Sequence, residues 1–165
     1  MTGVQTCALP IYAELVIAGD GPVQLTRSLQ EQARQLGIEK DVRWVGFVSG
    51  DAKHALLASA SVFVLPSWSE NFGFAVVEAM SARLPVVVTR AVGVSDLVDR
   101  AAAGIVIDHS VESLVTALVG LLRNATMRQQ MGEAGCRAVA RELSLETFGE
   151  RLAAMYDEVL TPRRA

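Results

Sequence analysis

The sequence predicts an α/β fold, built as a doubly wound parallel sheet with extra C-terminal helices. Short apolar runs alternate with amphipathic segments from residue 13 to residue 107, and such alternation produces parallel strands joined by right-handed helical crossovers. Hydrophobic residues make up 51% of the chain and charged residues 20%, as expected of strands buried on both faces. At 165 residues the chain is long enough for one layered domain and too short for two.

The predicted strands are short apolar runs that end at turn residues. The five runs are residues 13–18, 42–45, 62–65, 85–89 and 104–107. The first stops at Gly19-Asp20-Gly21-Pro22, the second at Gly46 and the third at Pro66. Glycine and proline favour turns, so we expect each of these strands to end there.

The segments between and after the strands have helical periodicity. Leu25, Leu29, Ala33 and Leu36 recur at intervals of three and four, which predicts an amphipathic helix closed by Gly37. Further helices are predicted at residues 52–60, 72–83, 95–99, 111–123, 125–141 and 144–160.

Polar side chains are predicted to cap three of these helices, because short polar residues accept hydrogen bonds from the first free amides. We expect Asp51 to cap the helix at 52–60, Asp108-His109 to cap the helix at 111–123, and Ser144 to cap the last helix.

Charge and composition argue against several classes of function. A net charge of −3 and a pI near 5.4 provide no basic surface for nucleic acid, and no apolar run reaches the ~20 residues that span a bilayer. The two histidines, His54 and His109, stand apart and predict no metal site; both are expected at the surface or in a cap. Cys7 and Cys136 lack metal-type spacing, so we expect reduced thiols in a cytoplasmic protein.

The first residues, MTGVQTCALPI, have neither the build of a secretion signal nor an amphipathic period. They resemble translated sequencing-adapter tails. We therefore expect residues 1–12 to be a non-native tail and residues 13–165 to be the domain.

The segment SWSENFGFAVVEAM, residues 67–80, follows the third strand. Ligands bind at the carboxyl ends of strands in open α/β sheets. Ser69, Asn71 and Gly73 lie where a helix is predicted to begin, and the free amides and dipole of a helix N-terminus suit phosphate. Gly73 would let a ligand approach the backbone without a β-carbon in the way.

Glu70 and Glu78 stand on either side of this helix start. Glu78 could accept hydrogen bonds from the hydroxyls of a ribose, and Glu70 from a sugar beyond the diphosphate. Together they would describe a nucleotide-sugar site. The residues alone also allow another interpretation, in which one glutamate favours the helix dipole and the other is solvated. Trp68 could line the site or be a buried aromatic.

Residues 66–80 followed by Leu84-Pro85-Val86-Val87 resemble the E-x7-E region of retaining GT-B glycosyltransferases of the family 4 (group 1) type. The resemblance extends over residues 13–160, through residues 15–22, 45–48 and 93–98. It implies that the chain is one Rossmann-like half of a GT-B fold, the C-terminal half that binds a nucleotide-sugar donor. UDP- or GDP-sugar is the expected donor, with no cofactor and no metal.

The resemblance also implies roles for individual residues. Glu70 would face the transferred sugar and assist catalysis, and Glu78 would hold the nucleotide ribose. The residues that would line the rest of the donor site are Asn71, Phe72 and Gly73 at the sugar and diphosphate, Gly46, Phe47 and Val48 beside the base, and Gly19 and Gly21 in the glycine turn.

This chain departs from the family pattern at three places. The family usually has a small residue, often glycine, where Arg83 stands, and a glycine pair where this chain has Val92-Gly93; Ser95-Asp96 replaces the commoner Pro-Glu. The fine shape of the site is expected to differ accordingly.

The family's basic pair, which neutralises the leaving diphosphate, would precede residue 13. The N-terminal acceptor-binding domain is likewise expected to be missing, so this chain is expected to be inactive alone. Any peripheral membrane association of the parent enzyme would depend on that absent domain. Two alternatives stay open: a stand-alone nucleotide-sugar binding module, and a piece of a GT-B-fold epimerase or phosphorylase.

Overall fold

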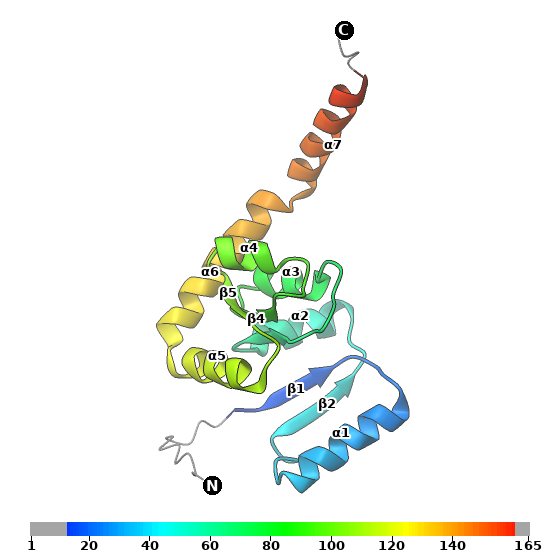
Figure 1. Cartoon of the computed structure of the whole chain (residues 1–165), viewed down its shortest axis with the longest axis vertical. Helices are drawn as coiled ribbons and strands as arrows, with labels where there is room; N and C mark the ends of the chain where they lie inside the picture. Colours follow the sequence, from blue (N-terminus) through cyan, green and yellow to red (C-terminus); the bar gives the residue numbers. More distant parts are fainter. Residues whose placement is uncertain (1–12, 161–165) are drawn as a thin grey trace. The chain divides into compact units, whose positions relative to one another are not determined.

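The computed structural model describes residues 13–160, and its strands and helices alternate as the sequence predicts (Figure 1). Their bounds are β1 (Leu15–Ala18), α1 (Val23–Gln35), β2 (Val42–Gly46), α2 (Gly50–Ser59), β3 (Phe63–Leu65), α3 (Phe74–Ser81), β4 (Val86–Thr89), α4 (Ser95–Arg100), β5 (Gly104–Ile107), α5 (Val111–Arg123), α6 (Ala125–Glu142) and α7 (Leu145–Leu160). The α/β prediction is confirmed. The expected tail at residues 1–12 lies outside the described residues.

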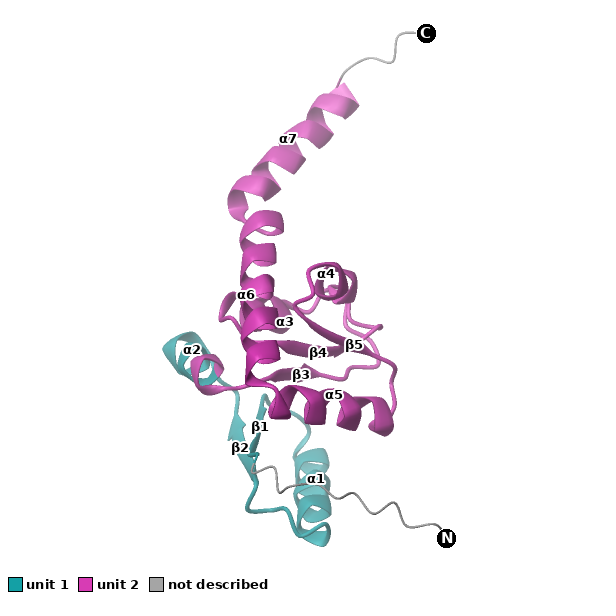
Figure 2. Cartoon of the chain, turned by 90° about the vertical axis from the view of Figure 1, so that its left-hand side faces the viewer, with its two compact units in different colours: residues 1–56 teal, residues 57–165 magenta. Residues whose placement is uncertain are grey.

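The chain divides into two compact units, residues 1–56 and 57–165 (Figure 2). Each unit has its own parallel sheet: β1 pairs with β2 in the first, and β3, β4 and β5 pair in that order in the second. The sequence did not predict which strands pair. Apolar runs predict where strands form, but they carry no information about which backbone edges pair.

The first unit packs loosely around its two strands. Val16 and Ile17 of β1 are half-buried, but Leu15 is 52% exposed, so the prediction that this strand is buried on both faces is wrong. Ala33 is the one buried residue of α1. The helix ends where predicted, because Gly37 adopts a left-handed φ of +69°.

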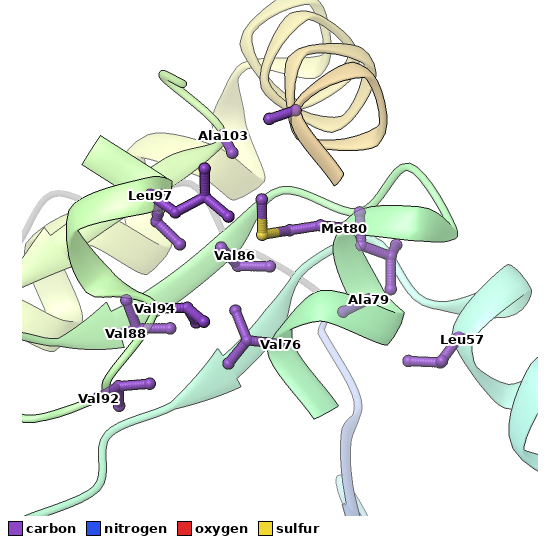
Figure 3. Packing of buried hydrophobic residues seen from close by; sticks show 13 residues of the cluster. Leu57, Val76, Ala79, Met80, Val86, Val88, Val92, Val94, Leu97 and Ala103 are labelled. Atoms are coloured by element: carbon purple, nitrogen blue, oxygen red, sulfur yellow. The ribbon is translucent and has the colours of Figure 1, made fainter. Parts of the chain in front are cut away.

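The second unit holds the main core, with β4 at its centre. All four residues of β4 are buried. Val86 and Val88 point to one face, where α3, α4 and α6 cover them through Val76, Met80, Leu97 and Ala138. Figure 3 shows this cluster, with Val92 and Val94 packed beside Val76.

The opposite face of this sheet is covered by α5. Val87 of β4 and Ile107 of β5 pack there against Ala117 and Leu121. Strand side chains alternate between faces, so β4 supplies both cores. The second unit is therefore a sheet between two helical layers, as a doubly wound fold requires.

The helix caps agree with the predictions only in part. Ser144 is confirmed, since its hydroxyl oxygen accepts from the Thr147 amide at 3.1 Å. Asp51 lies inside the first turn of α2, which begins at Gly50. The cap of α5 is Ser110, which accepts from the Ser113 amide at 3.1 Å, so the predictions for Asp51 and Asp108-His109 are wrong. Caps depend on where the first turn closes, which varies by one or two residues from any sequence estimate.

The end of α3 explains why the family prefers a small residue at the position of Arg83. Arg83 adopts a left-handed φ of +61°, while its amide donates to Met80 O and the Leu84 amide donates to Ala79 O, both at 3.0 Å. This is the Schellman arrangement, which normally has glycine at the left-handed position. The preference for a small residue here is therefore a backbone requirement.

The last helix, α7, has no buried residue. Its apolar side chains include Leu145, Phe148, Met155 and Val159, each at least half exposed. None of the helices within residues 13–160 has the length and apolar character needed to cross a bilayer.

Candidate donor-binding site

Gly73 fixes where α3 begins. It is the N-cap residue with a left-handed φ of +95°, and a β-carbon there would lie 2.9 Å from Val92 Cγ1. Its carbonyl accepts from the amides of Val76 and Val77 at 2.9 and 3.2 Å. Both the conformation and the space therefore require glycine.

The backbone amides that precede Val76 and Val77 have no acceptor among the described residues. Among residues 13–160, no hydrogen bond is made by the N–H groups of Gly73, Phe74 or Ala75, and α3 has no side-chain cap. Free amides at a helix start carry the positive end of the dipole. The helix start that the sequence predicted as a phosphate site is thus uncapped by the described part of the protein.

The loop leading to Gly73 is held by the turn that follows β4. The Glu70 amide donates to Ala91 O at 3.1 Å, the Gly93 amide donates to Glu70 O at 2.9 Å, and the Val94 amide donates to Phe72 O at 3.0 Å. Glu70 also forms a parallel bridge with Val92. The sequence separates these two segments by about twenty residues, and packing makes them one structural element.

Glu70 and Glu78 are both half-buried and both belong to this element. Glu70 Oε1 accepts from the Phe72 amide at 3.4 Å, so its carboxylate lies over the helix entrance. Glu78 lies inside α3, one turn beyond Gly73. A 3.4 Å contact is at the weak limit of hydrogen bonding, and a phosphate oxygen would compete for the same amide.

Two aromatic rings stand at the same helix start. Phe72 and Phe74 have ring centroids 4.8 Å apart with planes inclined by 54°, and Phe74 is 74% exposed. Asn71, between Glu70 and these rings, is exposed. The predicted residues Glu70 to Gly73 therefore form one compact group, and the ring of Phe74 packs beside it.

The residues predicted in the first unit form a second group. The Gly19 amide donates to Gly46 O at 2.8 Å, and the Phe47 amide donates to Asp20 Oδ1 at 3.1 Å. Gly19 and Gly46 have φ values of +127° and +65°. The turn after β1 and the loop after β2 are thus joined at the carboxyl ends of their strands.

Phe47 is 72% exposed, Val48 is half-buried and Gly21 is exposed. Asp20 was not predicted as a site residue, although it organises this group. Its position between two glycines of the turn was the available signal, because aspartate often accepts hydrogen bonds from nearby amides.

Trp68 is exposed, which rules out the buried interpretation. It keeps 79% of its surface accessible and stacks on His109, with ring centroids 3.5 Å apart. His54 is exposed, as the sequence predicted, and His109 is exposed too. Residues 13–160 contain no group of three or more histidine, cysteine, aspartate or glutamate residues arranged to hold a metal ion.

Comparison with known proteins decides the family. A model of the family "Glycosyl transferases group 1" matches residues 10–137. The chain belongs to this glycosyltransferase family. The resemblance drawn from the E-x7-E segment is thereby confirmed.

Curated relatives agree with this assignment. The chain is 30% identical over 147 residues to alpha-D-kanosaminyltransferase of Streptomyces kanamyceticus, which covers 88% of this chain and 38% of the relative. It is 41% identical over 93 residues to a glycosyltransferase of Methanocaldococcus jannaschii, covering 56% of this chain and 23% of the relative. The chain thus spans well under half the length of these relatives.

Solved structures have the same fold. Anabaena HepE in complex with UDP matches with a TM-score of 0.79 at 20% identity, covering 88% of this chain and 41% of that one. Sucrose-phosphate synthase from Thermosynechococcus elongatus matches with a TM-score of 0.78 at 20% identity, covering 88% and 38%. These similarities establish the fold of the chain.

Proposed function

We propose that this chain is the donor-binding half of a retaining glycosyltransferase that transfers a hexosyl unit from a nucleotide sugar to an acceptor. The uncapped start of α3 supports this most directly, because the free amides of Phe74 and Ala75 lie in the sequence between Glu70 and Glu78. Family membership supplies the reaction class, and one similar structure contains UDP and another UDP-glucose.

In this proposal the diphosphate of the donor binds at the start of α3. Its oxygens accept hydrogen bonds from the amides at and after Gly73, favoured by the helix dipole. Glycine at this position allows the close approach. The amide of Phe72 joins them once Glu70 turns from it toward the sugar.

The two carboxylates bind the two ends of the donor. Glu78 accepts from the ribose hydroxyls, and Glu70 accepts from the hydroxyls of the transferred sugar, where it helps to stabilise charge developing at the anomeric carbon. Asn71 and Phe72 contribute to the sugar side. In the first unit, Gly19, Gly21, Gly46, Phe47 and Val48 are assigned to the base and the adjoining turn.

The proposal includes a limit on activity. The leaving nucleoside diphosphate concentrates negative charge, and one helix terminus supplies only about half an elementary positive charge. We propose that further basic residues, outside the described donor site, neutralise the rest of this charge. The start of α3 then binds the donor, and transfer requires those additional cations.

Saturation-transfer NMR of the full chain with UDP-glucose, GDP-mannose and ADP-glucose tests the proposal. We expect contacts along the ribose and sugar of one of these donors. In Glu78→Ala, the ribose signals should fall and the affinity should drop about tenfold, since a hydrogen bond to a charged group contributes ~1.5 to 3 kcal/mol.

Glu146→Ala is the matched control, because Glu146 is an exposed glutamate in the first turn of another helix, α7. It should leave donor binding unchanged. Equal responses of the wild-type chain and Glu78→Ala would disprove the ribose assignment. Absence of binding to all three donors would disprove the proposed function of the chain.

A further inference from the structure

Trp68 and His109 form an aromatic pair that the proposed donor site does not use. Their ring planes are inclined by 25° at a centroid distance of 3.5 Å. Trp68 remains 79% exposed, so the face of the indole opposite His109 is open to water. A ring of this size on the surface leaves much apolar area unburied, which is a common property of binding surfaces.

Both rings stand on anchored loops. Ser67 O, just before Trp68, accepts from the hydroxyl of buried Thr89 at 2.5 Å, and the Ser67 hydroxyl donates to Ser69 O at 3.0 Å. On the other side, Asp108 O accepts from the Ser113 hydroxyl at 2.7 Å. The backbone on either side of the pair is therefore anchored, and stacking on His109 restrains the indole, which reduces the entropic cost of binding.

The pair lies at the ligand-binding edge of the second unit's sheet. Trp68 follows β3 and His109 follows β5, so both come from the carboxyl ends of parallel strands, where α/β proteins bind ligands. Trp68 also precedes Glu70 by two residues. At no more than ~3.6 Å of chain per residue, the backbone at Trp68 is within reach of a substrate held by Glu70.

A cation is paired with the loop that carries His109. Arg90, the first residue after β4, donates from Nε to Asp108 Oδ1 at 3.1 Å, and Asp108 adjoins His109. The two terminal nitrogens of Arg90 make no hydrogen bond with any residue in 13–160. The loop that carries His109 therefore presents guanidinium donors and a carboxylate acceptor.

We propose that Trp68, His109 and Arg90 form an acceptor subsite that takes a hexopyranose ring. The C–H bonds on one face of a pyranose carry partial positive charge and pack on the negative face of an indole. Its hydroxyls accept from the Arg90 guanidinium and donate to Asp108. The proposal rests on the proposed function, because only a transferase needs a second sugar near the donor.

The test uses Trp68 as its own reporter. The chain has two tryptophans, Trp44 and Trp68, so Trp44→Phe leaves Trp68 as the only indole. Methyl α-D-glucopyranoside and methyl α-D-mannopyranoside are titrated to about 100 mM, because single-ring stacking gives millimolar affinity at best. We expect a saturable shift of the Trp68 emission with at least one glycoside, and none with glycerol at the same concentration.

Variants distinguish glycoside binding at Trp68, His109 and Arg90 from a general effect of substitution on the protein. His109→Ala frees the indole and Arg90→Gln removes the cation, and each should weaken the glycoside about fivefold, a stacking or hydrogen-bond energy near 1 kcal/mol. Trp68→Leu should abolish glycoside signals in saturation-transfer NMR. His54→Ala, at an exposed histidine on α2, is the matched control and should change nothing.

Four outcomes overturn the proposal. A shift that does not saturate or that glycerol reproduces excludes a sugar subsite. UDP that shifts Trp68 and displaces the glycoside would assign the pair to the donor. If UDP binds with dependence on Glu78 while neither glycoside binds, the acceptor subsite is disproved and the donor function stands. If a glycoside binds while UDP does not, the donor function is disproved and Trp68 is a sugar-binding site without a role in transfer.

Discussion

A β-carbon on Gly93 would lie 2.1 Å from the carbonyl oxygen of Asn71 and 3.0 Å from the α-carbon of Phe72. The turn after β4 therefore packs its backbone directly on the loop that begins α3. Hydrogen bonds from Gly93 and Val94 to that loop reinforce the contact. The position of the proposed donor site depends on this glycine although its own atoms carry no chemistry.

Gly93→Ala should displace the loop and destabilise the second unit. No backbone atom can move aside cheaply in a packed interior, so we expect a loss of about 2 to 4 kcal/mol in the free energy of unfolding. UDP affinity should fall with it. Denaturant unfolding measures the loss of stability. The amide chemical shifts of Glu70 and Phe72 report the displacement of the loop, and their change during a UDP titration gives the affinity.

Gly120→Ala is the control for this substitution. Gly120 lies inside α5, and a β-carbon there would meet no atom within 4 Å. Alanine in a helix interior should raise stability by about 0.5 to 1 kcal/mol. If both alanine variants behave alike, the contact between Gly93 and Asn71 is not what positions the loop.

Arg83→Gly should stabilise the chain. Arg83 has a φ of +61°, and a residue with a side chain loses roughly 1 kcal/mol in the left-handed region. Glycine there relieves this strain and keeps the two hydrogen bonds that close α3, so we expect a higher melting temperature. Calorimetry of the variant checks it, and a lower melting temperature would show that the arginine side chain contributes more than its backbone costs.

Asp20→Ala should loosen the loop after β2. Asp20 Oδ1 accepts from the Phe47 amide, and loss of this acceptor should increase hydrogen exchange at that amide by about tenfold, equivalent to ~1.4 kcal/mol. Asp20→Asn retains an oxygen acceptor, so the Phe47 amide should exchange its hydrogen more slowly in this variant than in Asp20→Ala. Equal exchange in both variants would contradict the assigned role of Asp20.

Glu142 should make stability depend on acidity. A hydrogen bond from Arg141 at 2.7 Å, aided by Arg100 at 3.1 Å, lowers the pKa of the Glu142 carboxyl below its ordinary value of 4.5. A lowered folded-state pKa gives stability that is present above the ordinary value and is lost as pH falls through the folded value. Glu142→Gln should therefore melt lower than the wild-type chain at pH 7.

The difference in melting temperature between these two proteins should shrink below about pH 4.5. The variant Arg100→Gln Arg141→Gln Glu142→Gln serves as control, because removing all three partners leaves no unpaired charge in this group. A difference that stays constant down to pH 3, or that grows, would contradict the pairing of Glu142 with these arginines.

Local patterns in the sequence were sufficient for the elements and the region of the site. The strands and helices of residues 13–160 follow from apolar periodicity and from glycine and proline stops, since these signals act within a few residues. The segment from Ser67 to Met80 named the helix start and both glutamates. The caps predicted at Asp51 and Asp108-His109 were wrong, because a shift of the first turn by one or two residues changes which side chain meets a free amide.

By itself, the sequence determined the α/β alternation, the glycine at the start of α3 and the family of the chain. The tertiary structure decided what holds that helix start: Gly93 against Asn71, and Val92 against Gly73. It also decided that Trp68 stacks on His109 at the surface. These contacts join segments twenty to forty residues apart, and their existence depends on which strands pair and how helices cover them, which no local period encodes.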